Sequence, residues 1–117
     1  MKLTIERAAL LKALGHVQSV VERRNTIPIL ANVKISAADG KLALNATDMD
    51  IEIVESVAAS VAAKGATTAP AHTLYEIARK LPEGAEVEIE AGGDGKLTVR
   101  AGRSRFLLSC LPVEEFP

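Results

Sequence analysis

The sequence predicts an α+β fold in which one β-α-β-β-β unit occurs twice. Each half of the 117-residue chain has apolar residues at helical spacing, followed by three runs in which apolar and polar residues alternate. A similar hairpin segment also recurs, ADGKL at residues 38–42 and GDGKL at residues 93–97. We therefore expect two helices packed on one side of two mostly antiparallel four-stranded sheets.

The first half begins with a strand and a helix. Residues 2–6 alternate between polar and apolar side chains, which predicts a short strand. Helical spacing then relates four apolar residues: Leu10, Leu14, Val17 and Val21. We expect a helix over about residues 6–21, with Glu6 near its positive end and Pro28 preventing its continuation.

Three alternating runs follow this helix, at about residues 31–35, 42–46 and 51–58. They predict consecutive antiparallel strands, and the Asp39-Gly40 pair predicts a hairpin turn. The third run loses its alternation at Val54, so we expect a β-bulge there.

The second half repeats this order. Residues 66–69 predict a strand, and Pro70 predicts a helix that begins at about Ala71 and ends before Pro82. Three more strands are expected at about residues 86–90, 97–101 and 104–110. We treat residues 1–117 as one domain and expect residues 111–117 to begin a linker.

Composition excludes several classes of protein. An apolar content of 48% is too high for a disordered chain, and no apolar run approaches the ~20 residues of a membrane-spanning helix. No secretory signal is visible, and the single Cys110 fits a reducing cytoplasm. The net charge of −1 means that any contact with nucleic acid must come from local clusters of basic residues.

Basic side chains gather on the two expected helices. Lys12, His16, Ser19 and Arg23 form a polar stripe opposite the apolar face of the first helix, and Arg24 extends it. The second helix carries its own basic residues away from its apolar face: His72, Arg79 and Lys80. Such a surface could bind phosphates without reading sequence, but an ordinary solvated helix face would look the same.

No catalytic or metal-binding pattern is present. The Asp48–Asp50 pair is better explained by a capped loop between strands than by a metal site, and neither histidine has a nucleophile beside it in the sequence. We expect no catalytic residue, no metal ligand and no cofactor.

The last strand has two different faces. Arg103 and Arg105 share one face, and Phe106 and Leu108 share the other. An edge strand must be covered, blunted or paired, so the apolar pair could meet a partner strand. It could equally complete the local core, and both interpretations stay open here.

Five ordered segments resemble the bacterial DNA polymerase III beta subunit family, the sliding clamps. They are residues 1–7, 24–32, 47–48, 81–86 and 102–106. The resemblance covers the whole chain but only the first of three domains in that family. It implies that the helices line a hole around duplex DNA, that the sheets form the outer wall, and that two full-length chains close into a homodimeric ring.

The resemblance also implies a role and a set of residues. The ring would tether the replicative DNA polymerase III without catalysis of its own, and polymerase and clamp loader would bind later domains. Arg24 matches a DNA-contacting arginine, and His72 stands where the family often has a basic residue near DNA. The expected DNA-binding set is Arg24, His72, Lys12, Arg7, Arg23, Arg79 and Lys80. The expected ring-interface set is Phe106, Leu108, Ile77, Thr73, Arg103 and Arg105.

Two alternatives remain. One is a protein-interaction module that uses the Phe106–Leu108 edge strand and has no role on DNA. The other is a small enzyme built around His72 or Asp48.

Overall fold

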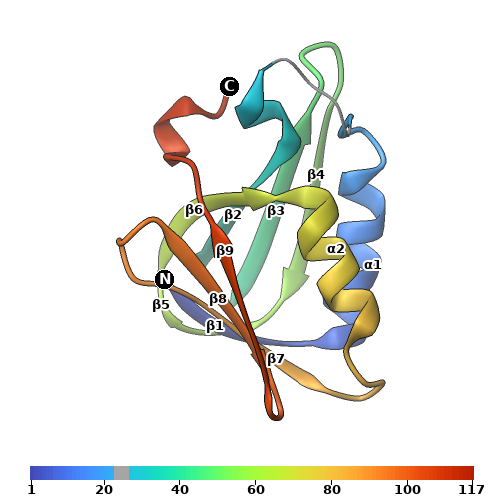
Figure 1. Cartoon of the computed structure of the whole chain (residues 1–117), viewed down its shortest axis with the longest axis vertical. Helices are drawn as coiled ribbons and strands as arrows, with labels where there is room; N and C mark the ends of the chain where they lie inside the picture. The colour runs from blue at the N-terminus through green and yellow to red at the C-terminus, as the bar shows by residue number, and fades with distance from the viewer. Residues whose placement is uncertain (23–26) are drawn as a thin grey trace.

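The computed structural model describes residues 1–22 and 27–117. Two helices lie side by side on one flank of the molecule, and two sheets form the rest (Figure 1). In the described residues the elements are β1 (Lys2–Glu6), α1 (Arg7–Gln18), η1 (Pro28–Ala31), β2 (Asn32–Ala38), β3 (Lys41–Thr47), β4 (Glu52–Ala58), β5 (Ser60–Ala63), β6 (Gly65–Pro70), α2 (Ala71–Lys80), β7 (Glu86–Ala91), β8 (Lys96–Ala101), β9 (Ser104–Ser109) and η2 (Val113–Glu115).

The predicted repeat is confirmed, and its two units exchange their first strands. One sheet has the order β4-β3-β2-β6, so the first strand of the second unit pairs with β2 of the first unit. The other sheet has the order β5-β1-β7-β8-β9, so β1 pairs with β7 of the second unit. All of these pairs are antiparallel.

One sheet has five strands where we predicted four. The additional strand is β5, which pairs with β1 at the edge of the sheet. Only Val61 among its four residues is even partly buried, so the segment lacks the apolar alternation that identifies a strand in a sequence.

The prediction of a β-bulge at Val54 was wrong. The β3–β4 register runs without interruption from Lys41↔Ala58 to Thr47↔Glu52. Val54 lies on the outward face of β4 and is 53% exposed, so the missing alternation reflects an apolar residue on the solvent side.

Helix α1 ends earlier than the apolar spacing predicted. Regular helix stops at Gln18, and turn hydrogen bonds carry the backbone on to Val21, which remains buried. Within the helix, Gly15 faces α2, where a Cβ atom would lie 3.5 Å from the Tyr75 ring. That distance is ordinary van der Waals contact, so an alanine at position 15 would fit between the helices.

The core is aliphatic and lies between the sheets and the helices. Its fully buried members include Leu14 of α1, Leu74 of α2, Ile35 of β2 and Ile89 of β7. At the far end of the chain, the Thr68 hydroxyl donates to the carbonyl of Leu111 at 2.7 Å, which ties the last residues to β6. None of the helices in the described residues is long and apolar enough to cross a membrane.

Candidate nucleic-acid interface and edge strand

The two helices run antiparallel and are joined at both ends by side-chain hydrogen bonds. Arg7, the first residue of α1, reaches the last turn of α2, where Nε donates to the Ala78 carbonyl and Nη2 to the Arg79 carbonyl, both at 3.0 Å. At the opposite end, Nε2 of His72 in the first turn of α2 lies 2.8 Å from the carbonyl of Val21, just beyond α1. Each end of the helix pair is therefore fixed by the partner helix.

Arg7 and His72 were both expected to contact DNA, and the structure gives both a protein partner. The Arg7 guanidinium satisfies carbonyls that a helix C-terminus otherwise leaves unpaired. The other ring nitrogen of His72, Nδ1, is buried and has no hydrogen-bond partner among the described residues. We therefore omit both side chains from the set that we propose to contact DNA.

The remaining predicted cations of the helices are exposed. Lys12 on α1 and Lys80 on α2 have no ion-pair partner within the described parts of the chain. Arg79 lies 5.7 Å from the centroid of the Tyr75 ring and pairs with Glu76 at 2.9 Å. Two residues of its own helix thus hold the Arg79 side chain, which is 55% exposed.

The polar stripe on α1 is less cationic than its sequence indicated. His16 Nδ1 lies 2.5 Å from Oε1 of Glu55 on β4, so this residue joins the helix to the edge of the four-stranded sheet. Arg23 and Arg24, the other members of the predicted set, lie outside the described residues. Lys12, Arg79 and Lys80 are the predicted DNA-binding residues that the structure places on the helices with exposed side chains.

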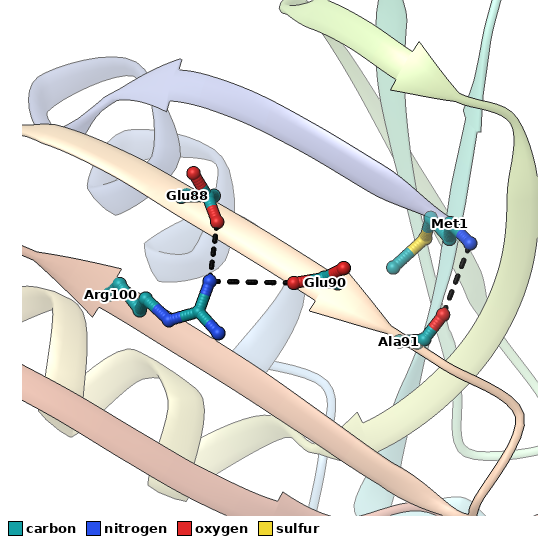
Figure 2. A network of polar contacts seen from close by, with 5 residues as sticks. All are labelled: Met1, Glu88, Glu90, Ala91 and Arg100. Carbon is teal, nitrogen blue, oxygen red and sulfur yellow. Dashed lines mark hydrogen bonds and ion pairs between the residues drawn. The ribbon is translucent and has the colours of Figure 1, made fainter.

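Charged residues of both signs lie on the solvent face of the five-stranded sheet. Glu86, Glu88 and Glu90 alternate along β7 with the core residues Val87 and Ile89. Figure 2 shows the neighbouring Arg100 of β8 reaching two of these carboxylates, with Nη1 2.6 Å from Glu88 and 3.4 Å from Glu90. Lys2 lies opposite Glu90, and Lys96 and Arg105 are exposed on the same face, so basic residues of the neighbouring strands offset these glutamates.

The Asp48–Asp50 segment is the capped loop that its sequence predicted. Oδ1 of Asp48 accepts hydrogen bonds from the backbone N–H groups of Asp50 at 2.9 Å and Ile51 at 2.8 Å. These backbone donors, with Ile51 contributing most, lower the pKa of the Asp48 carboxyl. Within residues 1–22 and 27–117, no three His, Cys, Asp or Glu side chains lie together in a group that could hold a metal ion.

Strand β9 forms an open edge of its sheet, as predicted. Leu108 is 5% exposed and belongs to the core, and Phe106 is half-buried and packs against that core. The local-core interpretation therefore applies to Leu108 in this chain. Arg105 is exposed on β9. Arg103 was predicted on the same strand face, but it lies in the turn before β9, where it is also exposed.

The hydrogen bonds of β9 show which backbone groups remain free. The Cys110 N–H donates to the Gly95 carbonyl at 2.9 Å, and hydrogen-bonded pairs alternate along an antiparallel ladder. The backbone groups of Arg105, Leu107 and Ser109 therefore point toward the open edge. Leu107 is 57% exposed there and was missed by sequence analysis, although it shares the strand face of Arg105.

The other two predicted interface residues lie on α2. Ile77 is 9% exposed and packs in the core, whereas Thr73 is exposed one turn earlier. The structure thus brings Phe106 and Leu108 onto one face of β9 but leaves Ile77 and Thr73 on a separate element.

Comparison with known proteins gives a consistent result over the whole chain. Residues 1–117 match the family model "DNA polymerase III beta subunit, N-terminal domain". The chain is 62% identical over 118 residues to a beta sliding clamp of Caulobacter vibrioides strain NA1000 / CB15N, and 47% identical to that of Escherichia coli K12. In both cases all of this chain aligns with 32% of the relative, so the chain spans about a third of their length.

Solved structures give the same result. A crystal structure of the DNA polymerase sliding clamp from Caulobacter crescentus matches with a TM-score of 0.97 and 62% identity, covering 100% of this chain and 32% of that one. A sliding clamp from Bartonella birtlesii matches with a TM-score of 0.95 and 44% identity, again over 100% of this chain and 33% of the other. The chain therefore belongs to the DNA polymerase III beta subunit family and corresponds to its N-terminal domain.

Proposed function

We propose that this chain is the N-terminal domain of a ring-shaped sliding clamp that encircles duplex DNA and tethers the replicative polymerase. The observation that carries the proposal is the match of residues 1–117 to the N-terminal domain of that family, at 62% identity to a protein named beta sliding clamp. The activity requires the complete ring, whose subunits are each longer than this chain. It takes place in the bacterial cytoplasm on the chromosome.

In this proposal the helices face the DNA and attract it weakly. Lys12, Arg79 and Lys80 are exposed on α1 and α2, and each unit charge contributes only about 1 kcal/mol at 4 Å in water. Contacts of this kind to phosphates carry no sequence information. Enclosure by the ring, rather than contact energy, would keep the clamp on DNA while it slides.

The sheet face would form the outer wall of the ring. Along it the glutamates of β7 are accompanied by Lys2, Lys96, Arg100 and Arg105, so the face has little net charge with which to attract phosphates. The total charge of −1 means that local attraction at the helices, rather than a large overall positive charge, would bring DNA to the domain.

The edge strand β9 is the element that we propose to meet the second subunit. Its free backbone groups can extend the sheet. The exposed side chains of Arg105 and Leu107 on the strand, with Arg103 in the turn before it, fit a neighbouring strand that carries acidic and apolar residues. Polymerase and clamp loader would bind parts of the protein beyond this chain. We assign no catalytic step to the domain.

The interaction-module hypothesis without a DNA role has less support, because the relatives are named for a clamp function. It predicts that removing exposed lysines from the helices has no effect on retention of the full-length protein on DNA.

The test compares two matched pairs of charge reversals in the full-length protein. Lys12→Glu with Lys80→Glu changes the helix face. Lys41→Glu on β3 with Lys64→Glu between β5 and β6, here called the sheet pair, makes the same total change on exposed lysines outside the helices. We expect the wild-type protein to stay on nicked circular DNA and to leave after linearisation. The helix pair should shorten retention on the circle at low salt, and the sheet pair should not.

Equal effects of the two pairs would contradict the assignment of the DNA face to the helices. Equal retention on circular and linear DNA would contradict the tethering mechanism itself.

A further inference from the structure

Tyr75, the single tyrosine of the chain, lies on α2 where the two helices run side by side (Figure 1). A Cβ atom placed on Gly15 of α1 would lie 3.5 Å from Cε1 of the tyrosine ring and 3.9 Å from its hydroxyl oxygen. The half-buried side chain therefore reaches across from α2 to α1, and its polar end lies at the seam between the helices.

The Tyr75 hydroxyl is free and open to solvent. It makes no hydrogen bond with residues 1–22 or 27–117. In these ranges the only side-chain nitrogen or oxygen that is both buried and unpaired is Nδ1 of His72, so the unpaired hydroxyl of the half-buried Tyr75 is not itself buried. A phenol hydroxyl that is buried usually finds a partner, whereas this one keeps its donor for solvent or a ligand.

Arg79 lies one turn after Tyr75 and is held against the same ring. Its Cζ atom is 5.7 Å from the ring centroid, a separation at which the aromatic face attracts a guanidinium. Nη1 pairs with Glu76 at 2.9 Å, and the other guanidinium donors have no partner in the part of the chain that the structure describes. The ring thus presents a hydroxyl donor and supports a cation that still has N–H groups to donate.

A second cation lies on the other side of the seam. Lys12 is exposed on α1, three residues before Gly15, and residues at this spacing are neighbours on a helix surface. It has no ion-pair partner among the described residues. The acidic side chain beside the ring on α2, Glu76, is already engaged by Arg79, so the seam favours an anion.

We infer that Tyr75 and Arg79 form a phosphate-contact site at the seam between α1 and α2. The Tyr75 hydroxyl donates to a phosphodiester oxygen of DNA, and the ring holds the guanidinium so that its free N–H groups donate to the same strand. Such contacts read no bases, as movement along any sequence requires. The inference rests on the proposed function for its ligand, because the helices must face the duplex.

The test is a titration of a short fluorescent DNA duplex with the full-length protein, measured as anisotropy at several salt concentrations. Tyr75→Phe removes the hydroxyl and keeps the ring against Gly15 and Arg79. We expect the dissociation constant to rise about two- to tenfold, the range for one net hydrogen bond. The slope of log affinity against log salt should not change, because a hydroxyl neutralises no phosphate charge and releases no counterion.

Two further variants separate the hydroxyl from the cation. Arg79→Gln removes a positive charge, so it should weaken binding and reduce the salt slope by about 0.9. Ser56→Ala removes an exposed hydroxyl on β4, away from the helices, and should leave the dissociation constant unchanged. Tyr75→Phe should also keep the wild-type midpoint of urea unfolding, since the hydroxyl has no partner to lose in the described residues.

Several results would overturn the inference. An unchanged dissociation constant in Tyr75→Phe, or no duplex binding by the wild-type protein at low salt, would show that the hydroxyl contacts no phosphate. A reduced salt slope in Tyr75→Phe would assign the loss to a displaced cation, and a lower urea midpoint would assign it to folding. An unchanged slope in Arg79→Gln would exclude the guanidinium from the site.

The proposed function fails by a different measurement. Equal retention of the wild-type protein on circular and linear DNA would refute tethering by the ring. The duplex titration would still decide whether Tyr75 contacts DNA, because it measures binding and not enclosure.

Discussion

Replacement of the half-buried Arg7 by alanine should destabilise the domain more than removal of any exposed charge on the helices. The guanidinium makes two hydrogen bonds of 3.0 Å, to the carbonyls of Ala78 and Arg79, across 71 and 72 residues of sequence. A hydrogen bond to a charged group contributes about 1.5–3 kcal/mol, which would give about 3–6 kcal/mol for the two together.

Solvent reduces this sum. One of the two contacts is exposed and the other only partly buried, and exposed charge interactions retain a small fraction of their ideal strength. We therefore expect a loss of about 2 kcal/mol in the free energy of unfolding. For a domain of this size, that corresponds to a fall of roughly 8 °C in Tm.

The assay is urea unfolding followed by circular dichroism, with two control variants. Lys12→Ala removes an exposed cation of the same helix that has no ion-pair partner in the described residues, and it should cost less than about 0.5 kcal/mol. Arg7→Lys keeps the charge but loses the two-pronged geometry, so it should recover about half of the loss. Full recovery with lysine would show that charge alone explains the effect, and a loss below about 0.5 kcal/mol in Arg7→Ala would refute the reasoning.

Other positions give further expectations. The pKa of Asp48 is lowered in the folded chain. Its carboxylate should therefore stabilise the β3–β4 turn above the unfolded pKa, and this stabilisation should be lost as pH falls through the folded pKa. The midpoint of urea unfolding should fall less steeply towards acid pH in Asp48→Ala than in the wild-type protein. Met49 has a φ of 82°, so Met49→Gly should relieve strain and raise stability by about 0.5 kcal/mol, measured as Tm. Leu107→Glu should leave folding intact but prevent dimerisation of the full-length protein in sedimentation experiments, whereas Leu108→Ala should cost about 2–4 kcal/mol of stability. A dimer that survives Leu107→Glu would exclude β9 as the proposed contact.

The elements with strong periodicity were predictable from sequence. The α2 boundaries follow from Pro70 before the helix and Pro82 after it. The similar hairpin segments at residues 38–42 and 93–97 indicated the duplication. Strand β5 was not predictable, because its residues are mostly exposed and it is recognised only through its pairing with β1. The regular pairing of β4 at Val54 was not predictable either, because this apolar residue lies on the solvent-exposed side of an edge strand.

The candidate site was predictable as a set of residues but not as a set of roles. Basic character at Arg7 and His72 is visible in the sequence, yet the carbonyls that bind them lie 71, 72 and 51 residues away. No local pattern encodes an acceptor at that separation, because backbone carbonyls are present at every position. Likewise, the alternation of β9 predicted two faces, but only the ladder with β8 shows which backbone groups remain free.

The exchange of first strands between the two units has a consequence for how the domain can exist. Neither half can complete a sheet by itself, because β1 fills a place beside β7 and β6 fills the matching place beside β2. A lone half would therefore have an unpaired position in its sheet and an unpaired first strand. Two identical halves could complete each other's sheets only by exchanging their first strands. Because one polypeptide contains both copies, the exchange of first strands takes place within a single molecule. Both halves must therefore fold and unfold together.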